Sequence, residues 1–127
     1  MKRPDYSKLP QILEAMNEEG GYSVSVLARG DGLLVASASA PDVNRDVVAA
    51  MCGIITEVAE RVRSDLKLGE VKDISLRCAE GKAVFKKVGA LGDEVLIIGA
   101  MMPRKVRYHS RAIGKASTQI RKLMGYR

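Results

Sequence analysis

The most extensive hydrophobic pattern in the chain lies between about residues 43 and 68 and has helical periodicity. Its apolar side chains cover an arc of about 160°, whereas a helix packed on a single core needs an arc of about 100°. They are Val47, Val48, Met51, Cys52, Ile54, Ile55, Val58, Ala59, Val62 and Leu66. Each large aliphatic side chain left in water forgoes about 1.5–3 kcal/mol, so the surplus needs a second cover. We expect a long helix with one edge on a sheet of its own chain and the other edge on a second subunit.

Two shorter amphipathic helices are predicted near the ends of the chain. Apolar residues three and four positions apart predict a helix over residues 7–19, with Ser7 as its N-cap and Gly20 and Gly21 as its stop. The same periodicity predicts a helix over residues 104–124. Basic side chains form one face of this last helix, opposite its apolar positions: Arg107, Arg111, Lys115 and Lys122.

Five segments have the features of β-strands. Residues 22–29 alternate between polar and apolar positions and are followed by a Gly-Asp-Gly turn, which favours a hairpin. Residues 94–100 are apolar without alternation, which indicates a strand covered on both faces at the centre of a sheet. Short turns at residues 80–81 and 89–92 join the last three strands, and Asp42 is the expected N-cap of the long helix. The strands are predicted at residues 22–29, 33–38, 71–79, 82–88 and 94–100.

The order of these elements, helix, two strands, long helix, three strands and helix, defines the fold class. Strands joined by tight hairpins are antiparallel, so we predict an α+β domain with a five-stranded antiparallel sheet. A central strand that is apolar on both faces needs helices above and below it. The simplest arrangement is a three-layer α/β/α sandwich, with the long helix on one face and both terminal helices on the other. A length of 127 residues fits a single domain over residues 1–127.

Neither a membrane span nor a secretion signal is visible in the sequence. The longest apolar run, residues 95–102, is far shorter than the roughly 18 residues that a span needs, and the N-terminal segment has no hydrophobic signal core. Cys52 and Cys78 have no second pair that would indicate a disulfide framework or a zinc site, and we expect both to be buried, reduced thiols. We therefore expect a cytoplasmic protein.

The net charge of +6 is unevenly distributed along the chain. Before Val95 there are 13 Lys and Arg against 15 Asp and Glu, and after Glu94 there are eight Lys and Arg and no acid. The basic face of the last helix has three interpretations: a solvated surface, binding to an acidic protein or membrane surface, or binding to nucleic acid. One Phe, four Tyr and no Trp offer few stacking platforms, which argues against nucleic acid as a partner.

No residue pattern indicates an enzyme, a metal site or a cofactor site. The Gly30-Asp31-Gly32 turn lacks the glycine run and the following Lys and Ser or Thr of a phosphate-binding loop, so the chain is not expected to be a GTPase itself. The single histidine, His109, has no carboxylate nearby in sequence, which favours a packed or surface histidine over a catalytic one. Cys52 has no adjacent base or cation that would lower its pKa. Neighbouring carboxylates fit helix caps and solvated helix faces.

Three segments together resemble the Roadblock/dynein light chain family. They are GGYSVSVLARGDGLLVASAS, EGKAVFKKVGALGDEVLIIGA, and a last helix that carries Arg111-Ala112 and ends in Ile120 and Leu123; the resemblance extends from about Leu9 to Leu123. It implies a sheet with strand order 2-1-5-4-3 and a dimer, with a copy or a paralogue, in which the third strands and the long helices pair. It also implies a scaffold or regulator of a small Ras-like GTPase, or an adaptor subunit of a motor or signalling complex.

Two surfaces follow from the resemblance together with the surplus apolar arc. Self-association is expected on the second edge of the long helix and on the third strand, at Val48, Cys52, Ile55, Ala59, Ile74, Leu76 and Cys78. Contacts with a GTPase are expected on the polar side of the long helix, at Arg45, Asp46, Glu57, Glu60 and Arg61. A non-enzymatic, dimeric regulator or scaffold is the favoured hypothesis. The alternatives are a module whose basic last helix docks on nucleic acid or an anionic surface, and a small-ligand sensor with a cavity between sheet and helices.

Overall fold

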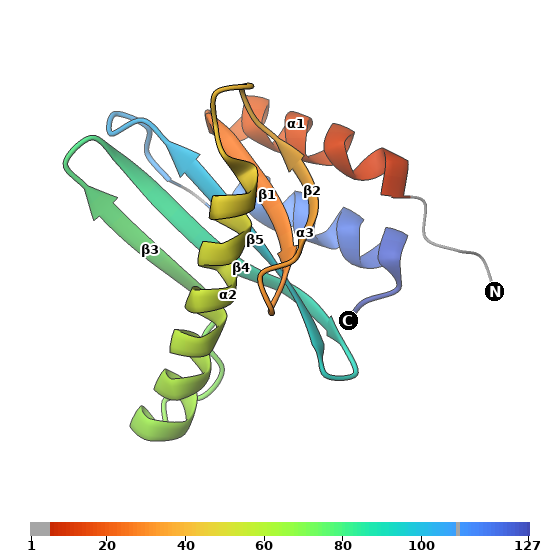
Figure 1. Ribbon diagram of the computed structural model, residues 1–127, viewed down its shortest axis with the longest axis vertical. Helices are drawn as coiled ribbons and strands as arrows, with labels where there is room; N and C mark the ends of the chain where they lie inside the picture. Colours follow the sequence, from red (N-terminus) through yellow and green to blue (C-terminus); the bar gives the residue numbers. More distant parts are fainter. Residues whose placement is uncertain (1–5, 109) are drawn as a thin grey trace.

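The computed structural model describes residues 6–108 and 110–127, and this part of the chain contains three α-helices and five strands in the predicted order (Figure 1). A short 3-10 segment, η1 (Tyr6–Lys8), precedes the first helix, and a π-helical segment, η2 (Val62–Leu66), continues the second. The helices are α1 (Leu9–Gly20), α2 (Arg45–Arg61) and α3 (Arg111–Met124). The strands are β1 (Val24–Arg29), β2 (Leu34–Ala38), β3 (Asp73–Cys78), β4 (Gly81–Leu91) and β5 (Glu94–Met102).

The five strands form one antiparallel sheet in the order β2-β1-β5-β4-β3. β5 lies at the centre, and its buried residues alternate between the two faces, with Leu96 and Ile98 on one side and Ile97 on the other. β3 lies at one edge and pairs with β4. The α+β class, the central position of the last strand and the strand order implied by the family resemblance are all confirmed.

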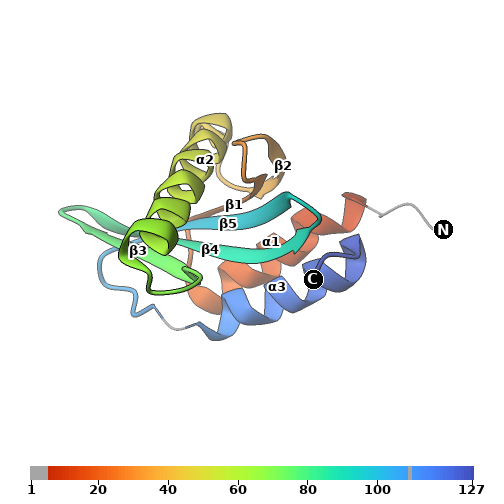
Figure 2. The same ribbon diagram turned by 90° about the horizontal axis from the view of Figure 1, so that it is seen from below.

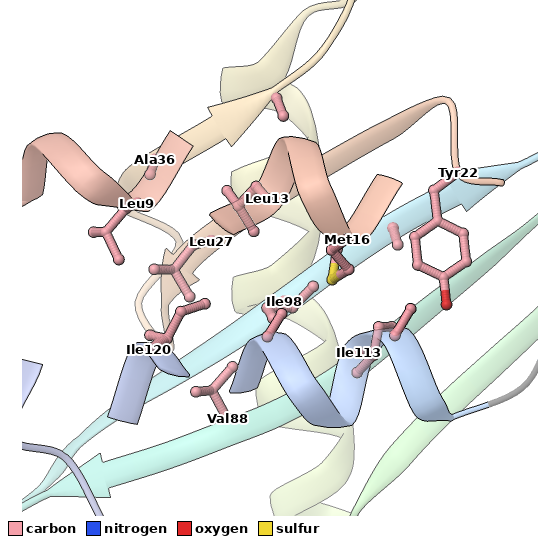
Figure 3. Close-up of a cluster of buried hydrophobic side chains, with 14 of the residues drawn as sticks. Leu9, Leu13, Met16, Tyr22, Leu27, Ala36, Val88, Ile98, Ile113 and Ile120 are labelled. Atoms are coloured by element: carbon pink, nitrogen blue, oxygen red, sulfur yellow. The ribbon is translucent and has the colours of Figure 1, made fainter. Parts of the chain in front are cut away.

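Helices cover both faces of the sheet, as Figure 2 shows: α2 lies on one face, and α1 and α3 lie side by side on the other. Strand alternation divides the apolar side chains between two cores, so that Leu27 of β1 points toward α1 and α3 while Val26 points toward α2. Figure 3 shows the larger of the two, the α1/α3 core, in which Leu9, Leu13, Met16, Leu27, Ile98, Ile113 and Ile120 meet. The smaller α2 core contains Val24, Val26, Ala28, Ala49, Cys52, Ile55, Phe85 and Ile97.

The last helix is shorter than predicted and begins at Arg111 instead of residue 104. After β5 the chain makes a turn in which the Val106 N–H donates to the Pro103 carbonyl (3.1 Å). Val106 and Tyr108 pack against the α1/α3 core from this irregular segment. These two residues reach the core from non-helical backbone, so the helix is needed only from Arg111 onward.

Two of the predicted helix caps are wrong. Lys8, not Ser7, occupies the N-cap position of α1, because η1 leads the chain directly into the helix. Asn44, not Asp42, caps α2: the Asn44 side chain accepts a hydrogen bond from the Val47 N–H (3.2 Å). Asp42 belongs to the preceding turn, which brings Asn44 to the start of the helix.

Glycines with positive φ end α1 and form the last hairpin turn. Gly21 (φ 73°) terminates α1 as predicted. The turn between β4 and β5 is tighter than the predicted turn at residues 89–92 and uses the left-handed conformation of Gly92 (φ 60°). β4 continues through the residues predicted to form the turn. Its pairing with β5 shifts register between Lys87 and Gly89, as in a β-bulge, and then resumes.

Candidate protein-binding surface on α2 and β3

Close contacts at glycines beneath α2 and on one of its flanks fix the rotation of this helix on the sheet. Cys52 is fully buried beneath the helix, and a Cβ added at Gly99 in the central strand would lie 3.1 Å from its Sγ. On one flank of the helix, a Cβ at Gly53 would lie 3.1 Å from the Cα of Gly32 in the β1–β2 turn. The flank of α2 that carries Gly53 therefore faces the β1–β2 hairpin, and the opposite flank lies on the β3 side of the sheet (Figure 2).

The flank on the β3 side carries an exposed apolar stripe, named the apolar edge of α2. Its four side chains recur at intervals of three and four residues, which places them on one line along the helix. They are Val47 (56% exposed), Met51 (41%), Ile54 (52%) and Val58 (44%). The width of the apolar stripe predicts that the sheet leaves part of it uncovered. These exposed side chains confirm that prediction.

The division of the stripe between sheet and solvent corrects the expected interface residues on this helix. Cys52 and Ile55, expected to face a partner, are buried in the α2 core of the same chain. Val48 and Ala59 are half-buried, and Val48 packs against the same core. Sequence spacing gives the width of the stripe but not the direction from which the sheet meets it. The close approach of Gly53 to the β1–β2 turn sets that direction, and the small size of this residue was the available signal.

β3 is an edge strand whose outer side has no partner among the described residues. Ile74 packs against the α2 core, whereas Leu76 is 41% exposed and Cys78 is exposed. The expectation that Cys78 is buried is wrong, because its strand is covered on one flank alone. Unpaired N–H and C=O groups on such an edge favour pairing with another strand.

A cleft of about 210 Å³ lies between the C-terminal half of α2 and the sheet, next to these two surfaces. Apolar side chains such as Ile55 and Phe85 form its floor, and charged side chains form its rim. At the rim, Arg63 Nε donates to Glu60 (3.1 Å), and this hydrogen bond lowers the pKa of the Glu60 carboxyl. Ligand pockets usually enclose about 300–1,000 Å³, so the cleft gives little support to a small-ligand sensor.

The polar residues expected to contact a GTPase are all exposed, but they do not form one strip. Asp46, Glu57 and Arg61 are separated by eleven and four residues, which places them on the outer face of α2. Arg45 directly precedes Asp46 and therefore points about 100° away from it around the helix axis. Glu60 is engaged with Arg63 at the rim of the cleft. The structure therefore places three of the five predicted residues on one face of the helix.

The predicted basic face of the last helix is retained in part. Arg111, Lys115 and Lys122 are carried by α3, and Lys115 Nζ lies 3.9 Å from a carboxylate oxygen of Glu19 in α1. Arg107 is not on this face, because it lies in the segment before the helix. His109 lies outside the described residues.

The described residues offer no grouping of three or more His, Cys, Asp or Glu side chains that could hold a metal ion. Burial raises the pKa of the Cys52 thiol to about 12, so the thiol keeps its proton at neutral pH and is a poor nucleophile. Across residues 6–108 and 110–127, no helix is both long and apolar enough to cross a membrane.

The order of the sheet, the three layers and the open edge beside an apolar helix flank define an α/β/α sandwich of the Roadblock type. Comparison with protein families gives the same result, because the Roadblock/LC7 domain matches residues 9–96. The chain therefore belongs to the Roadblock/LC7 family. No curated protein sequence matches it.

Solved structures extend the likeness over nearly the whole chain. MglB from Myxococcus xanthus superimposes with a TM-score of 0.84 and 13% identity, covering 98% of this chain and 93% of that chain. The gliding protein MglB from Thermus thermophilus has a TM-score of 0.76 and 13% identity, with the same coverage of 98% and 93%. A Roadblock/LC7 domain from Streptomyces avermitilis has a TM-score of 0.70 and 13% identity, covering 89% and 91%. At this level of identity the likeness establishes the fold.

Proposed function

We propose that this protein is a dimeric, non-enzymatic regulator or scaffold of a small Ras-like GTPase. The observation that carries the proposal is the apolar edge of α2 beside the unpaired edge of β3. Together they form a surface suited to a protein partner. Membership of the Roadblock/LC7 family supports a regulatory domain in place of a catalytic one.

The partner at this surface is a second copy of the chain or a paralogue with the same edge. Antiparallel pairing of two β3 strands joins the sheets into one of ten strands and satisfies the free backbone groups at both edges. The two α2 helices then lie side by side over the joined sheet and bury their apolar edges against each other. The proposed interface residues are Val47, Met51, Ile54 and Val58, with Ile74, Leu76 and Cys78 on β3.

The outer face of α2 stays accessible in such a dimer and is the proposed GTPase-binding surface. Asp46, Glu57 and Arg61 line this face, with Arg45 at one end and Glu60 at the cleft. A GTPase held there needs no inserted catalytic residue to be regulated. Preferential binding to one arrangement of its switch loops shifts their population and so changes the rate of hydrolysis.

A binding titration with purified small Ras-like GTPases from the source cell tests this function. Each GTPase is loaded with GDP or with a non-hydrolysable GTP analogue, and we expect one of them to bind with a preference for one nucleotide state. Replacing Arg45→Glu together with Arg61→Glu is expected to weaken binding about tenfold or more, because it reverses charges at the contact.

The matched control is Lys122→Glu combined with Arg111→Glu, which makes the same change of charge on α3. We expect this variant to bind like the unaltered protein. Absence of binding in both nucleotide states, or an equal loss in the α3 variant, contradicts the proposed function.

A further inference from the structure

The end of the sheet at the β3–β4 turn collects basic side chains from three parts of the chain. They surround an open hollow of about 480 Å³, named the basic hollow, which is lined by Arg77, Cys78, Ala79, Lys82 and Arg104. Arg77 comes from β3, Lys82 from β4, and Arg104 from the segment after β5. Glu80, in the turn itself, is exposed and does not line the hollow.

The cations of the basic hollow lie close together, and no acidic residue is among the described residues that line it. Arg77 and Lys82 are direct cross-strand partners, and like charges in this position destabilise an antiparallel pair. The Lys82 ammonium group donates to the Val106 carbonyl (2.6 Å), which anchors it beside the segment that carries Arg104. Neither arginine forms an ion pair or a side-chain hydrogen bond with a described residue. The repulsion is therefore uncompensated in the described part of the chain.

The basic hollow shares Cys78 with the surface proposed for dimerisation, but Arg77 and Lys82 lie on the other face of the sheet. Ile74 of β3 packs against the α2 core, so strand alternation places Arg77 on the opposite face of the sheet. Lys82, its cross-strand partner, shares that face and reaches the segment before α3. A partner on the apolar edge of α2 and on the backbone edge of β3 leaves this face accessible.

We propose that the basic hollow binds a phosphate group. Two guanidinium groups offer paired N–H donors that match phosphate oxygens, and the Lys82 ammonium group adds a third positive charge. Three cations suit a phosphomonoester dianion better than a single carboxylate, and the bound dianion removes the repulsion between Arg77 and Lys82. Soluble phosphorylated metabolites and phosphoinositide headgroups both carry this group. The site is independent of the proposed GTPase-binding function.

Titration with inorganic phosphate at constant ionic strength, followed by amide NMR shifts, tests the site directly. We expect saturable shifts at the β3–β4 turn and around Arg104. Arg77→Gln and Arg104→Gln are each expected to weaken binding about tenfold or more, the effect of losing a hydrogen bond to a charged group. Lys122→Gln, which removes one charge from the far end of α3, is expected to leave the affinity unchanged.

Thermal unfolding gives a second readout that a merely structural arginine would not produce. Without phosphate, Arg77→Gln is expected to unfold at a higher temperature than the unaltered protein, because the cross-strand repulsion is gone. With phosphate, the unaltered protein gains stability by mass action and the variant gains less, because it binds phosphate more weakly. Equal stabilisation of both proteins by phosphate overturns the proposal.

Vesicles identify the source of the phosphate group. They consist of phosphatidylcholine with or without phosphatidylinositol phosphate, and binding is measured by cosedimentation. Arg77-dependent binding to the phosphoinositide vesicles alone assigns a lipid headgroup, whereas binding of inorganic phosphate without vesicle binding assigns a soluble ligand. Absence of binding in both experiments, or an equal loss in Lys122→Gln and Arg77→Gln, overturns the proposal.

Discussion

At the end of α1, one missing side chain positions a core aromatic residue. A Cβ added at Gly20 would lie 2.4 Å from Cζ of Tyr22. The Tyr22 ring is 7% exposed and lies between α1 and α3, near Met16 and Ile113 (Figure 3). Gly20 is expected from the sequence to stop the helix, but the structure includes it in α1 and leaves the stop to Gly21. The reason for glycine at position 20 is therefore packing.

We expect Gly20→Ala to lower the free energy of unfolding by about 1–3 kcal/mol, the usual cost of overpacking. The matched control is Gly114→Ala in α3, where an added Cβ meets no heavy atom within 4 Å. That substitution is expected to raise stability by about 0.5–1 kcal/mol, because alanine is the better helix former. Urea denaturation measures both values. Changes of the same sign and size in the two variants contradict the packing role of Gly20.

Several protons are held more tightly in the folded chain than in the unfolded one. Tyr126 Oη donates to the Glu94 carboxylate, whose other oxygen lies 2.9 Å from Arg29 Nε. Burial, followed by the bond to Glu94, raises the pKa of Tyr126 to about 12. Burial is also the main cause that raises the pKa of Tyr22 and of Cys52 to about 12. All three groups therefore lose their protons more readily after unfolding.

The raised pKa values predict that stability falls at alkaline pH. The contribution of the two tyrosines is fully present below their unfolded pKa of about 10 and is lost as the pH rises toward 12. Cys52 acts in the same direction from its unfolded pKa of 9.0. The free energy of unfolding as a function of pH, with tyrosinate absorbance, measures this fall. A stability that rises from about pH 10 to about pH 12 contradicts the assignment.

Replacing Tyr126→Phe isolates the bond to Glu94. We expect the free energy of unfolding to fall by about 1 kcal/mol at neutral pH, because the hydrogen bond is lost. Above about pH 10 the free energy of unfolding should decrease less steeply with pH, because the Tyr126 hydroxyl no longer titrates. Tyr6→Phe, at a residue that is 53% exposed, is the control. Tyr6 is the smallest of the causes that raise the pKa of Tyr126, so this variant is expected to change both quantities much less. Urea denaturation at several pH values provides both measurements.

Helix α2 is positioned partly by local contacts within its own first turn and partly by contacts with distant strands. Its start depends on the Asn44 side chain, which accepts a hydrogen bond from the Val47 N–H in the first turn. Its middle rests on the sheet where Gly99 allows close approach. Its end continues into η2 beside the cleft and leaves Leu66 61% exposed. The helix is thus fixed at its start and centre, while its free flank remains available to a partner.

Asn44→Ala is expected to lower the free energy of unfolding by about 1 kcal/mol, because it leaves the Val47 N–H without its cap. Asp42→Ala, at the residue that sequence reasoning favoured as the cap, is the matched control and is expected to have little effect. Chemical denaturation of both variants compares them. A larger loss in the Asp42 variant contradicts the observed capping.

The whole molecule presents two unsatisfied surfaces on opposite sides of its sheet. The apolar edge of α2 lies on one face of the sheet, next to the open edge of β3. The cations of the basic hollow lie on the other face. Cys78 belongs to both surfaces, but Ile54 and Arg77 each belong to one of them. A variant at either of these two positions is expected to leave the other surface intact. The two proposals can be tested independently for this reason.

Ile54→Asp is expected to convert the proposed dimer to a folded monomer, because the dimer would bury a charge on the apolar edge without a partner. Cys52→Ser is the contrasting variant, since Cys52 lies in the α2 core. It is expected to lower the free energy of unfolding by about 1–3 kcal/mol and to keep the dimer. Sedimentation and urea denaturation measure both properties. A monomer at high micromolar concentration for the unaltered chain contradicts dimerisation.

The sequence alone determined the elements, the α+β class and the surplus apolar surface of α2. These features depend on periodicity, which is a local property: Leu96, Ile97 and Ile98 in an unbroken apolar run are enough to indicate a central strand. The family resemblance added the strand order that the structure has.

The tertiary structure alone decided which edge of α2 is free, where α3 begins and which cations meet at the basic hollow. Each of these depends on contacts between residues far apart in the chain. The close approach of Gly53 to Gly32 sets the rotation of α2. Val106 packs on the core from a segment that the sequence predicts to be helical and that is not. Arg77 and Arg104 line one hollow because the β3–β4 hairpin and the segment after β5 lie at the same end of the sheet. A local sequence pattern cannot indicate such contacts, because they arise from the packing of the whole fold.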